Sequence, residues 1–115
     1  MAITPKQIIA PRYLPNGVGA EEAIYTCPTG TKCVIRKLTF TNPTAGSINY
    51  TVYIVPSGDT SADDTIVIDA LAIGAGLSDS PDRLIGHVLE AGGMIRAFAS
   101  GASSINVVGS GTEVV

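Results

Sequence analysis

The sequence of 115 residues contains few of the side chains from which active sites are built: it has no Trp, one His and two Cys. Histidine is the commonest general base and a frequent metal ligand, so one copy leaves little material for either role. His87 stands three positions before Glu90, but no residue near it has the surroundings of an activated nucleophile. We therefore expect no enzyme activity, no cofactor and no metal site.

Charged side chains are also scarce, at 15% of the sequence, and the formal net charge is -3. Binding of nucleic acid without sequence preference needs an excess of Lys and Arg, so we expect no nucleic-acid partner. No apolar run approaches the roughly 18 residues of a membrane-spanning helix, and the first residues lack the pattern of a secretory signal. We therefore expect no membrane association.

The charges are divided unevenly along the chain. Residues 1–57 contain five Lys or Arg and two Asp or Glu, whereas the remainder contains two basic and eight acidic residues. If the halves formed separate faces, copies of the chain would dock head to tail. Because the strands of a sandwich interleave, we expect the fold to mix these charges instead.

Thirteen Gly and seven Pro divide the chain into short segments rich in Val, Ile and Thr, which is typical of strands. The clearest is 48–55, in which apolar and polar residues alternate. The predicted strands are 22–26, 32–41, 48–55, 65–73, 84–89, 94–99 and one that starts at 104. A change of phase in 32–41 predicts a bulge near Arg36. The spacing predicts one all-β domain over 21–115, an antiparallel β-sandwich or jelly roll.

Residues 1–20 form an extended N-terminal arm in this interpretation, because Pro5, Pro11 and Pro15 disfavour a helix. The arm carries apolar side chains that suit docking either on its own domain or on a neighbouring molecule. The predicted partner-binding residues are Ile8, Ile9, Tyr13 and Leu14. We expect the domain to fold without this arm.

Cys27 and Cys33 flank five residues around a predicted turn, so a hairpin would place them opposite each other. Two free, half-buried thiols and a disulfide are both compatible with this spacing. A disulfide would form only after release into an oxidising medium. A zinc site would need two further ligands, and only His87 offers itself.

Exposed aromatic residues on a β-sandwich are a common platform for carbohydrates. By alternation, Phe40 and Tyr50 belong in the core, whereas Tyr53 lies on the opposite face of its strand. Tyr53 is therefore the candidate exposed aromatic contact. One isolated tyrosine predicts at most a weak sugar site.

Three stretches share a strand-and-turn pattern: 25–42, which begins YTCPTGT; 52–58, VYIVPSG; and 88–114, which contains VLEAG and ends SGTEV. Together they resemble small all-β structural proteins of tailed bacteriophages, in which a Tyr-Thr-Val-Pro-x-Gly segment precedes a long strand and a closing Asn. The resemblance covers about residues 5–114. It departs at Cys27, where the family has an aliphatic residue, and at Gly93 and Met94, where it has an acidic and a polar one.

This resemblance implies a non-enzymatic virion protein, made in the host cytoplasm. The preferred interpretation is a capsid decoration (cement) protein, a homo-oligomer that binds the major capsid protein or other virion proteins and stabilises the particle. The alternatives are an accessory of the tail or fibre, or a glycan- or receptor-binding β-sandwich module. The strand-and-turn motifs do not distinguish the head from the tail, nor do they give the number of copies.

Overall fold

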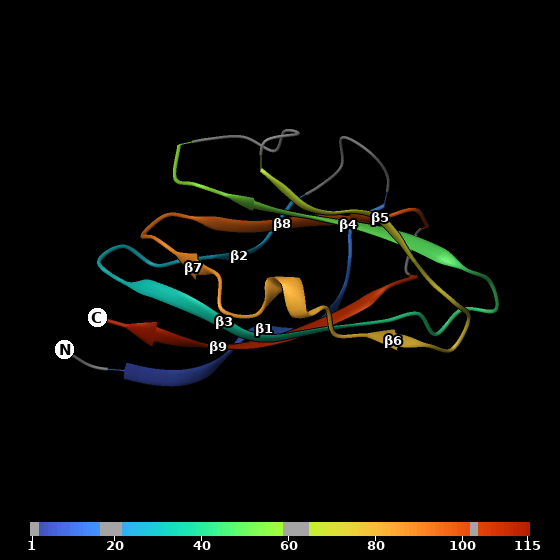
Figure 1. Ribbon diagram of the computed structural model, residues 1–115, viewed down its shortest axis with the longest axis horizontal. Coiled ribbons are helices and arrows are strands. Elements are labelled where there is room, and N and C mark those ends of the chain that lie inside the picture. Colours follow the sequence, from blue (N-terminus) through green and yellow to red (C-terminus); the bar gives the residue numbers. More distant parts are fainter. Residues whose placement is uncertain (1–2, 17–21, 59–64, 102–103) are drawn as a thin grey trace.

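The computed structural model describes residues 3–16, 22–58, 65–101 and 104–115, which fold into two packed β-sheets (Figure 1). The elements are β1 (Ile3–Tyr13), β2 (Glu22–Thr26), β3 (Lys32–Thr41), β4 (Ile48–Val55), β5 (Ile66–Ile73), β6 (Ser78–Asp79), the 3-10 helix η1 (Asp82–Leu84), β7 (Val88–Leu89), β8 (Met94–Ala99) and β9 (Asn106–Val114). The predicted all-β fold is confirmed. Among the described residues, no helix has the length and apolar composition needed to cross a membrane.

Each sheet is built from strands that are distant in the sequence. Sheet A has the order β1-β9-β3-β6, with β7 also paired to β3, and sheet B has the order β2-β8-β4-β5. All these pairs are antiparallel. Successive strands change sheets at most connections, which is the arrangement of a jelly roll. Alternation in the sequence predicts two packed sheets but leaves a simple sandwich and a jelly roll open. The strand order decides for the jelly roll.

The core between the sheets contains buried side chains from strands of both sheets. Tyr50 and Val52 in β4 are fully buried, as is Phe40 in β3. The rings of Phe40 and Tyr50 stack across the two sheets with their centroids 4.4 Å apart. The prediction that both rings lie inside is therefore confirmed.

Two further predictions about strands have opposite outcomes. The pairing of β3 with β9 shifts register between Ile35 and Lys37, which confirms the bulge predicted near Arg36. The strand predicted over 84–89 is wrong, since η1 and the two-residue β7 occupy this region. Gly86 has φ +89, a left-handed conformation that interrupts an extended strand.

The segment predicted as an arm is strand β1, the edge strand of sheet A. It pairs with β9 from Ile3 to Tyr13. An edge strand tolerates proline because it needs backbone donors on one side only. Two shifts of register in this pairing allow the consecutive residues Ile8 and Ile9 both to face the core. The predicted boundary at residue 20 is therefore corrected: the sandwich includes the described residues 3–16.

Candidate docking surface

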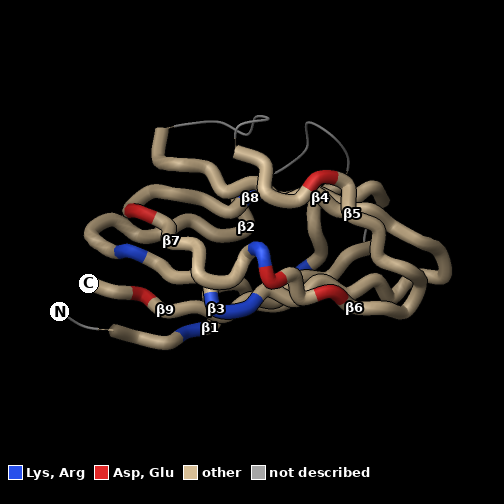
Figure 2. The backbone as a smooth tube through the Cα atoms, in the orientation of Figure 1, with Lys and Arg blue, Asp and Glu red and all other residues tan. Residues whose placement is uncertain are grey.

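The basic residues of the first half of the chain collect on sheet A. Lys6 and Arg12 lie in β1, and Lys32, Arg36 and Lys37 lie in β3 (Figure 2). The expected mixing of charges does occur for Lys6 and Lys32, which pair with acidic residues of the second half, but all five cations share one sheet. The reason is the strand order, since β1 and β3 both pair with β9 whereas β2 lies in sheet B.

The acidic residues of the sheet A strands turn into the sandwich, where each accepts a hydrogen bond from a tyrosine of sheet B. Tyr50 donates to Asp79 over 2.6 Å, and Tyr25 donates to Glu113 over 2.9 Å. Burial, and then the hydrogen bond to Asp79, raises the pKa of Tyr50 above its usual range, so its proton stays in this bond. Among the described residues, the strands of sheet A thus place no carboxylate on their outer face.

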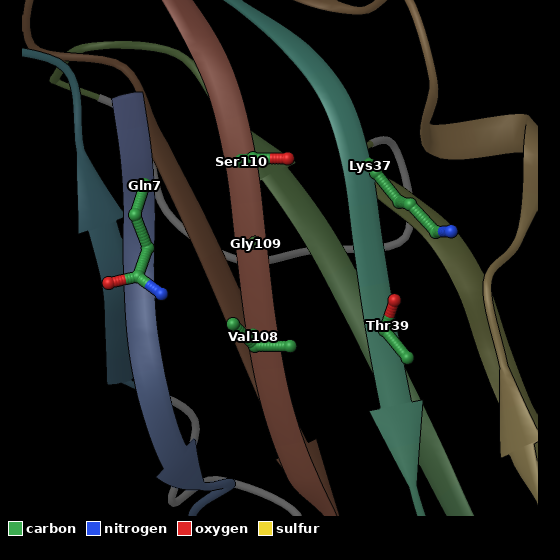
Figure 3. Close-up of a pocket in the computed structure, with 6 residues that line it drawn as sticks. All are labelled: Gln7, Lys37, Thr39, Val108, Gly109 and Ser110. Atoms are coloured by element: carbon green, nitrogen blue, oxygen red, sulfur yellow. The ribbon is translucent and has the colours of Figure 1, made fainter. Parts of the chain in front are cut away.

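The outer face of sheet A is hollowed where β1, β9 and β3 run side by side. This hollow, of about 320 Å³, is lined by Gln7, Lys37, Thr39, Val108, Gly109 and Ser110. Figure 3 shows the labelled side chains on one side of these three strands, with strands of sheet B behind them. An amide, two hydroxyls and an ammonium group can bind polar or acidic groups of a partner. They do not pair a nucleophile with a base.

Several cations of sheet A already have partners within the chain. Lys6 lies 3.4 Å from the carboxylate of Glu113. Lys32 lies 3.5 Å from that of Glu90 in an exposed pair, which is weak because water screens it. On the outer face, Arg36 donates through Nε to the hydroxyl of Thr112 over 3.2 Å.

Lys37 differs from these residues. Within the described part of the chain its side chain is exposed and makes no hydrogen bond or ion pair. The remaining guanidinium donors of Arg36 lie on the same strand. These two residues and the hollow beside them form the candidate docking surface. Sequence reasoning missed it, although the uneven distribution of charge was the signal that pointed there.

Three of the four predicted arm residues lie in the protein's own core. Ile8, Ile9 and Leu14 are exposed by only 8%, 2% and 3%. Their assignment to partner binding is corrected, because they pack between the two sheets. Tyr13, exposed by 50%, is the one of the four that remains accessible at the surface.

The predicted aromatic contact, Tyr53, is only partly exposed. It lies in β4 of sheet B and packs against Phe98 of β8, with ring centroids 6.3 Å apart. Its ring therefore has an aromatic neighbour in its own chain and does not stand as an isolated platform. It does not line the hollow on sheet A.

The two cysteines are brought together, but not by a hairpin. Cys27 follows β2 of sheet B, whereas Cys33 lies in β3 of sheet A, so the turn between them connects the two sheets. Both are buried free thiols, and their Sγ atoms lie 2.9 Å apart. The described residues contain no cluster of three or more His, Cys, Asp or Glu that could hold a metal ion.

No protein-family model matches this sequence. No curated protein matches it either. Among solved structures, a chain from the structure of infectious bursal disease virus, Gx strain, is similar over 97% of this chain, with a TM-score of 0.50 and 14% identity. This chain spans 32% of the length of that chain. At this level of identity the likeness is one of fold.

Proposed function

We propose that this chain is a non-enzymatic structural component of a virus particle. The strand order supports this, because jelly rolls recur in viral capsid and lectin domains. The likeness to a chain of a virus structure extends over nearly the whole of this sequence, which also supports it. The sequence resemblance to tailed-bacteriophage proteins extends the proposal to a phage particle, and the form that we propose first is a decoration protein on the assembled shell.

The face that meets the shell in this proposal is the outer face of sheet A. The observation that carries this part is the separation of charge, with Arg36 and Lys37 outside and the carboxylates of Asp79 and Glu113 turned inward. Opposite charges steer two surfaces together and suppress wrong partners. The partner is therefore an acidic patch of a shell subunit. The predicted attachment through residues 1–20 is replaced, since Ile8, Ile9 and Leu14 are in the core.

Co-sedimentation with purified particles that lack this protein tests the proposal. We expect the wild-type chain to bind, and to bind less as salt is added, because salt screens exposed charges. Lys37→Gln should weaken binding by up to about fivefold, the range of an exposed ion pair. Asn49→Asp is the matched control: Asn49 is exposed on sheet B, and this change also lowers the net charge by one unit.

The outcomes test the virion function and the assignment of the docking surface to sheet A separately. Failure of the wild-type chain to bind particles would overturn the virion function, and a screen against glycans would then follow. Binding that Lys37→Gln and Asn49→Asp weaken equally would retain the function and reject the face. The copy number per particle, measured by quantitative mass spectrometry, then distinguishes decoration from a tail or fibre accessory, since decoration requires copies comparable to those of the shell subunit.

A further inference from the structure

A line of polar side chains, partly buried at Tyr25 and Glu113 and fully buried at the two cysteines, runs across the end of the sandwich where β2 passes to β3. Cys27 and Cys33 contact each other at 2.9 Å, and the Sγ atom of Cys33 lies 2.7 Å from the hydroxyl of Tyr25. That hydroxyl lies 2.9 Å from the carboxylate of Glu113. The ammonium group of Lys6, near the surface, lies 3.4 Å from the same carboxylate. These side chains form one continuous chain of contacts from the surface to the pair of thiols.

The number of protons on each group fixes which group donates in each of these hydrogen bonds. A carboxylate only accepts, so the single hydroxyl proton of Tyr25 is donated to Glu113. The contact between Tyr25 and Cys33 must then be made by the S–H of Cys33, which donates to the phenol oxygen. The proton of Cys33 therefore already points along a path that ends at a carboxylate.

The proton of Cys27 has other acceptors. Its Sγ atom lies 3.2 Å from the carbonyl oxygen of Thr31 and 3.6 Å from that of Leu89, in addition to Cys33. Burial, and then the hydrogen bond with Cys33, raises the pKa of Cys27 to about 12. Cys27 thus remains a thiol at neutral pH, and Cys33 is the sulfur with a path for losing its proton.

We propose that Cys27 and Cys33 are an oxidisable pair that closes into a disulfide joining the two sheets, with Tyr25 and Glu113 as a relay that removes the proton of Cys33. Closure would tie sheet B to sheet A at this end of the sandwich. Such a bond suits a protein that acts outside the reducing cytoplasm. This proposal goes beyond the docking function proposed above and does not depend on that function.

The oxidant in this proposal is hydrogen peroxide, which is small enough to reach a buried sulfur. The proton of Cys33 passes to the phenol oxygen of Tyr25 as the proton of Tyr25 passes to Glu113. The Cys33 thiolate then attacks one peroxide oxygen, the O–O bond breaks, and the released hydroxide takes the proton held at Glu113 to become water. The Cys33 sulfenic acid is next attacked by Cys27, whose proton leaves with the hydroxyl group as a second water. Two thiols and one peroxide thus give one disulfide and two waters.

Solvent comes close to this pair through an open hollow of about 460 Å³ at the same end of the molecule. Thr31, whose carbonyl oxygen contacts Cys27, is among the residues that line it. The walls include Lys32 and Glu90, which form the exposed ion pair. A small oxidant in this hollow is therefore separated from the sulfurs by the turn that carries Cys27.

Titration of the folded full chain with hydrogen peroxide tests the disulfide, with peptide mapping under non-reducing conditions as the readout. We expect the loss of two hydrogens within one chain, a cross-linked peptide containing both cysteines, and reversal by dithiothreitol. Cys33→Ser should abolish this product. Recovery of two free thiols, of intermolecular dimers only, or of separately over-oxidised cysteines would overturn the proposal.

The rate of disulfide formation tests the role of Tyr25 and Glu113. Tyr25→Phe should slow closure at least several-fold, and Tyr50→Phe is the matched control, because it removes the other tyrosine–carboxylate bond and lies away from the thiols. A purely structural effect would speed closure in both variants by loosening the sandwich. If Tyr25→Phe does not fold, Glu113→Gln keeps an acceptor for Tyr25 but takes up no proton. Closure in the folded variant at the wild-type rate or faster would overturn the relay.

Discussion

The hydroxyl of Tyr50 in β4 and the carboxylate of Asp79 in β6 lie 2.6 Å apart and join the two sheets by a charge-assisted hydrogen bond. Tyr50→Phe should lower the free energy of unfolding by about 1–3 kcal/mol, because it leaves the partly buried Asp79 without this donor. Urea denaturation followed by circular dichroism measures the loss. Tyr13→Phe, at an exposed position, should change stability by less than about 0.5 kcal/mol. Equal losses in the two variants would show that the bond is not stabilising.

Stability should decline at alkaline pH. Burial is the main cause that raises the pKa of Tyr50 above its ordinary 10.0, and it raises that of Cys27 from 9.0 to about 12. The unfolded chain releases these protons as the pH rises through 9.0 and 10.0, while the folded chain keeps them. The contribution of each group is therefore fully present below its unfolded pKa and is lost above it, by at most about 1.4 kcal/mol per pH unit.

Urea titrations between about pH 8 and pH 11 measure this decline. The slope above about pH 10 should be smaller in Tyr50→Phe, which removes one of the groups. Stability that is flat over this range in the wild-type chain would contradict the prediction. Stability that rises with pH would contradict it more strongly, since the unfolded state would then bind more protons than the folded state.

Most strands of the sandwich could be predicted because alternation and β-branched residues act locally. The segment 48–55 alternates from Ile48 to Val52, and β4 occupies Ile48–Val55. The strand β1 was missed because its three flanking and internal prolines imply an arm, whereas its backbone is fixed by β9, whose paired residues lie 93 to 111 positions later in the sequence. Just after β3, the sequence gives no sign that the Asn42 side chain is fully buried and donates hydrogen bonds to the carbonyl oxygens of Gly46 and Ile73.

The candidate docking surface could not be predicted, since it depends on strand order. Nothing local in the sequence says that β1 and β3 share a sheet while β2 lies in the other. Nor does it say that the two carboxylates of sheet A face inward, which depends on Tyr25 and Tyr50 lying opposite them. The spacing of Cys27 and Cys33 did predict their proximity, because a short turn keeps its ends close whatever sheets it connects.

The burial of β1 predicts that this strand is required for folding. Ile9 is exposed by only 2%, so Ile9→Ala should lower the free energy of unfolding by about 2–5 kcal/mol through lost burial and the cavity that it leaves. Tyr13→Ala, on the same strand but exposed, should have a much smaller effect. Denaturant titration of the two variants compares them directly. A wild-type midpoint for Ile9→Ala would restore the interpretation of this segment as a separate arm.

Close packing of β9 against β3 makes Gly111 a position where any side chain would meet the backbone of the neighbouring strand. A Cβ atom at this position would lie 2.6 Å from the carbonyl oxygen of Val34, a backbone atom that cannot rotate away. Gly111→Ala should therefore force the strands apart and cost about 1–3 kcal/mol, as overpacking does elsewhere. Gly46→Ala is the matched control, because nothing lies within 4 Å of a Cβ there. A lower urea midpoint with an unchanged m-value for Gly111→Ala alone is the expected result. Equal midpoints would show that β9 and β3 separate without cost, and the contact with Val34 would then not restrict this position.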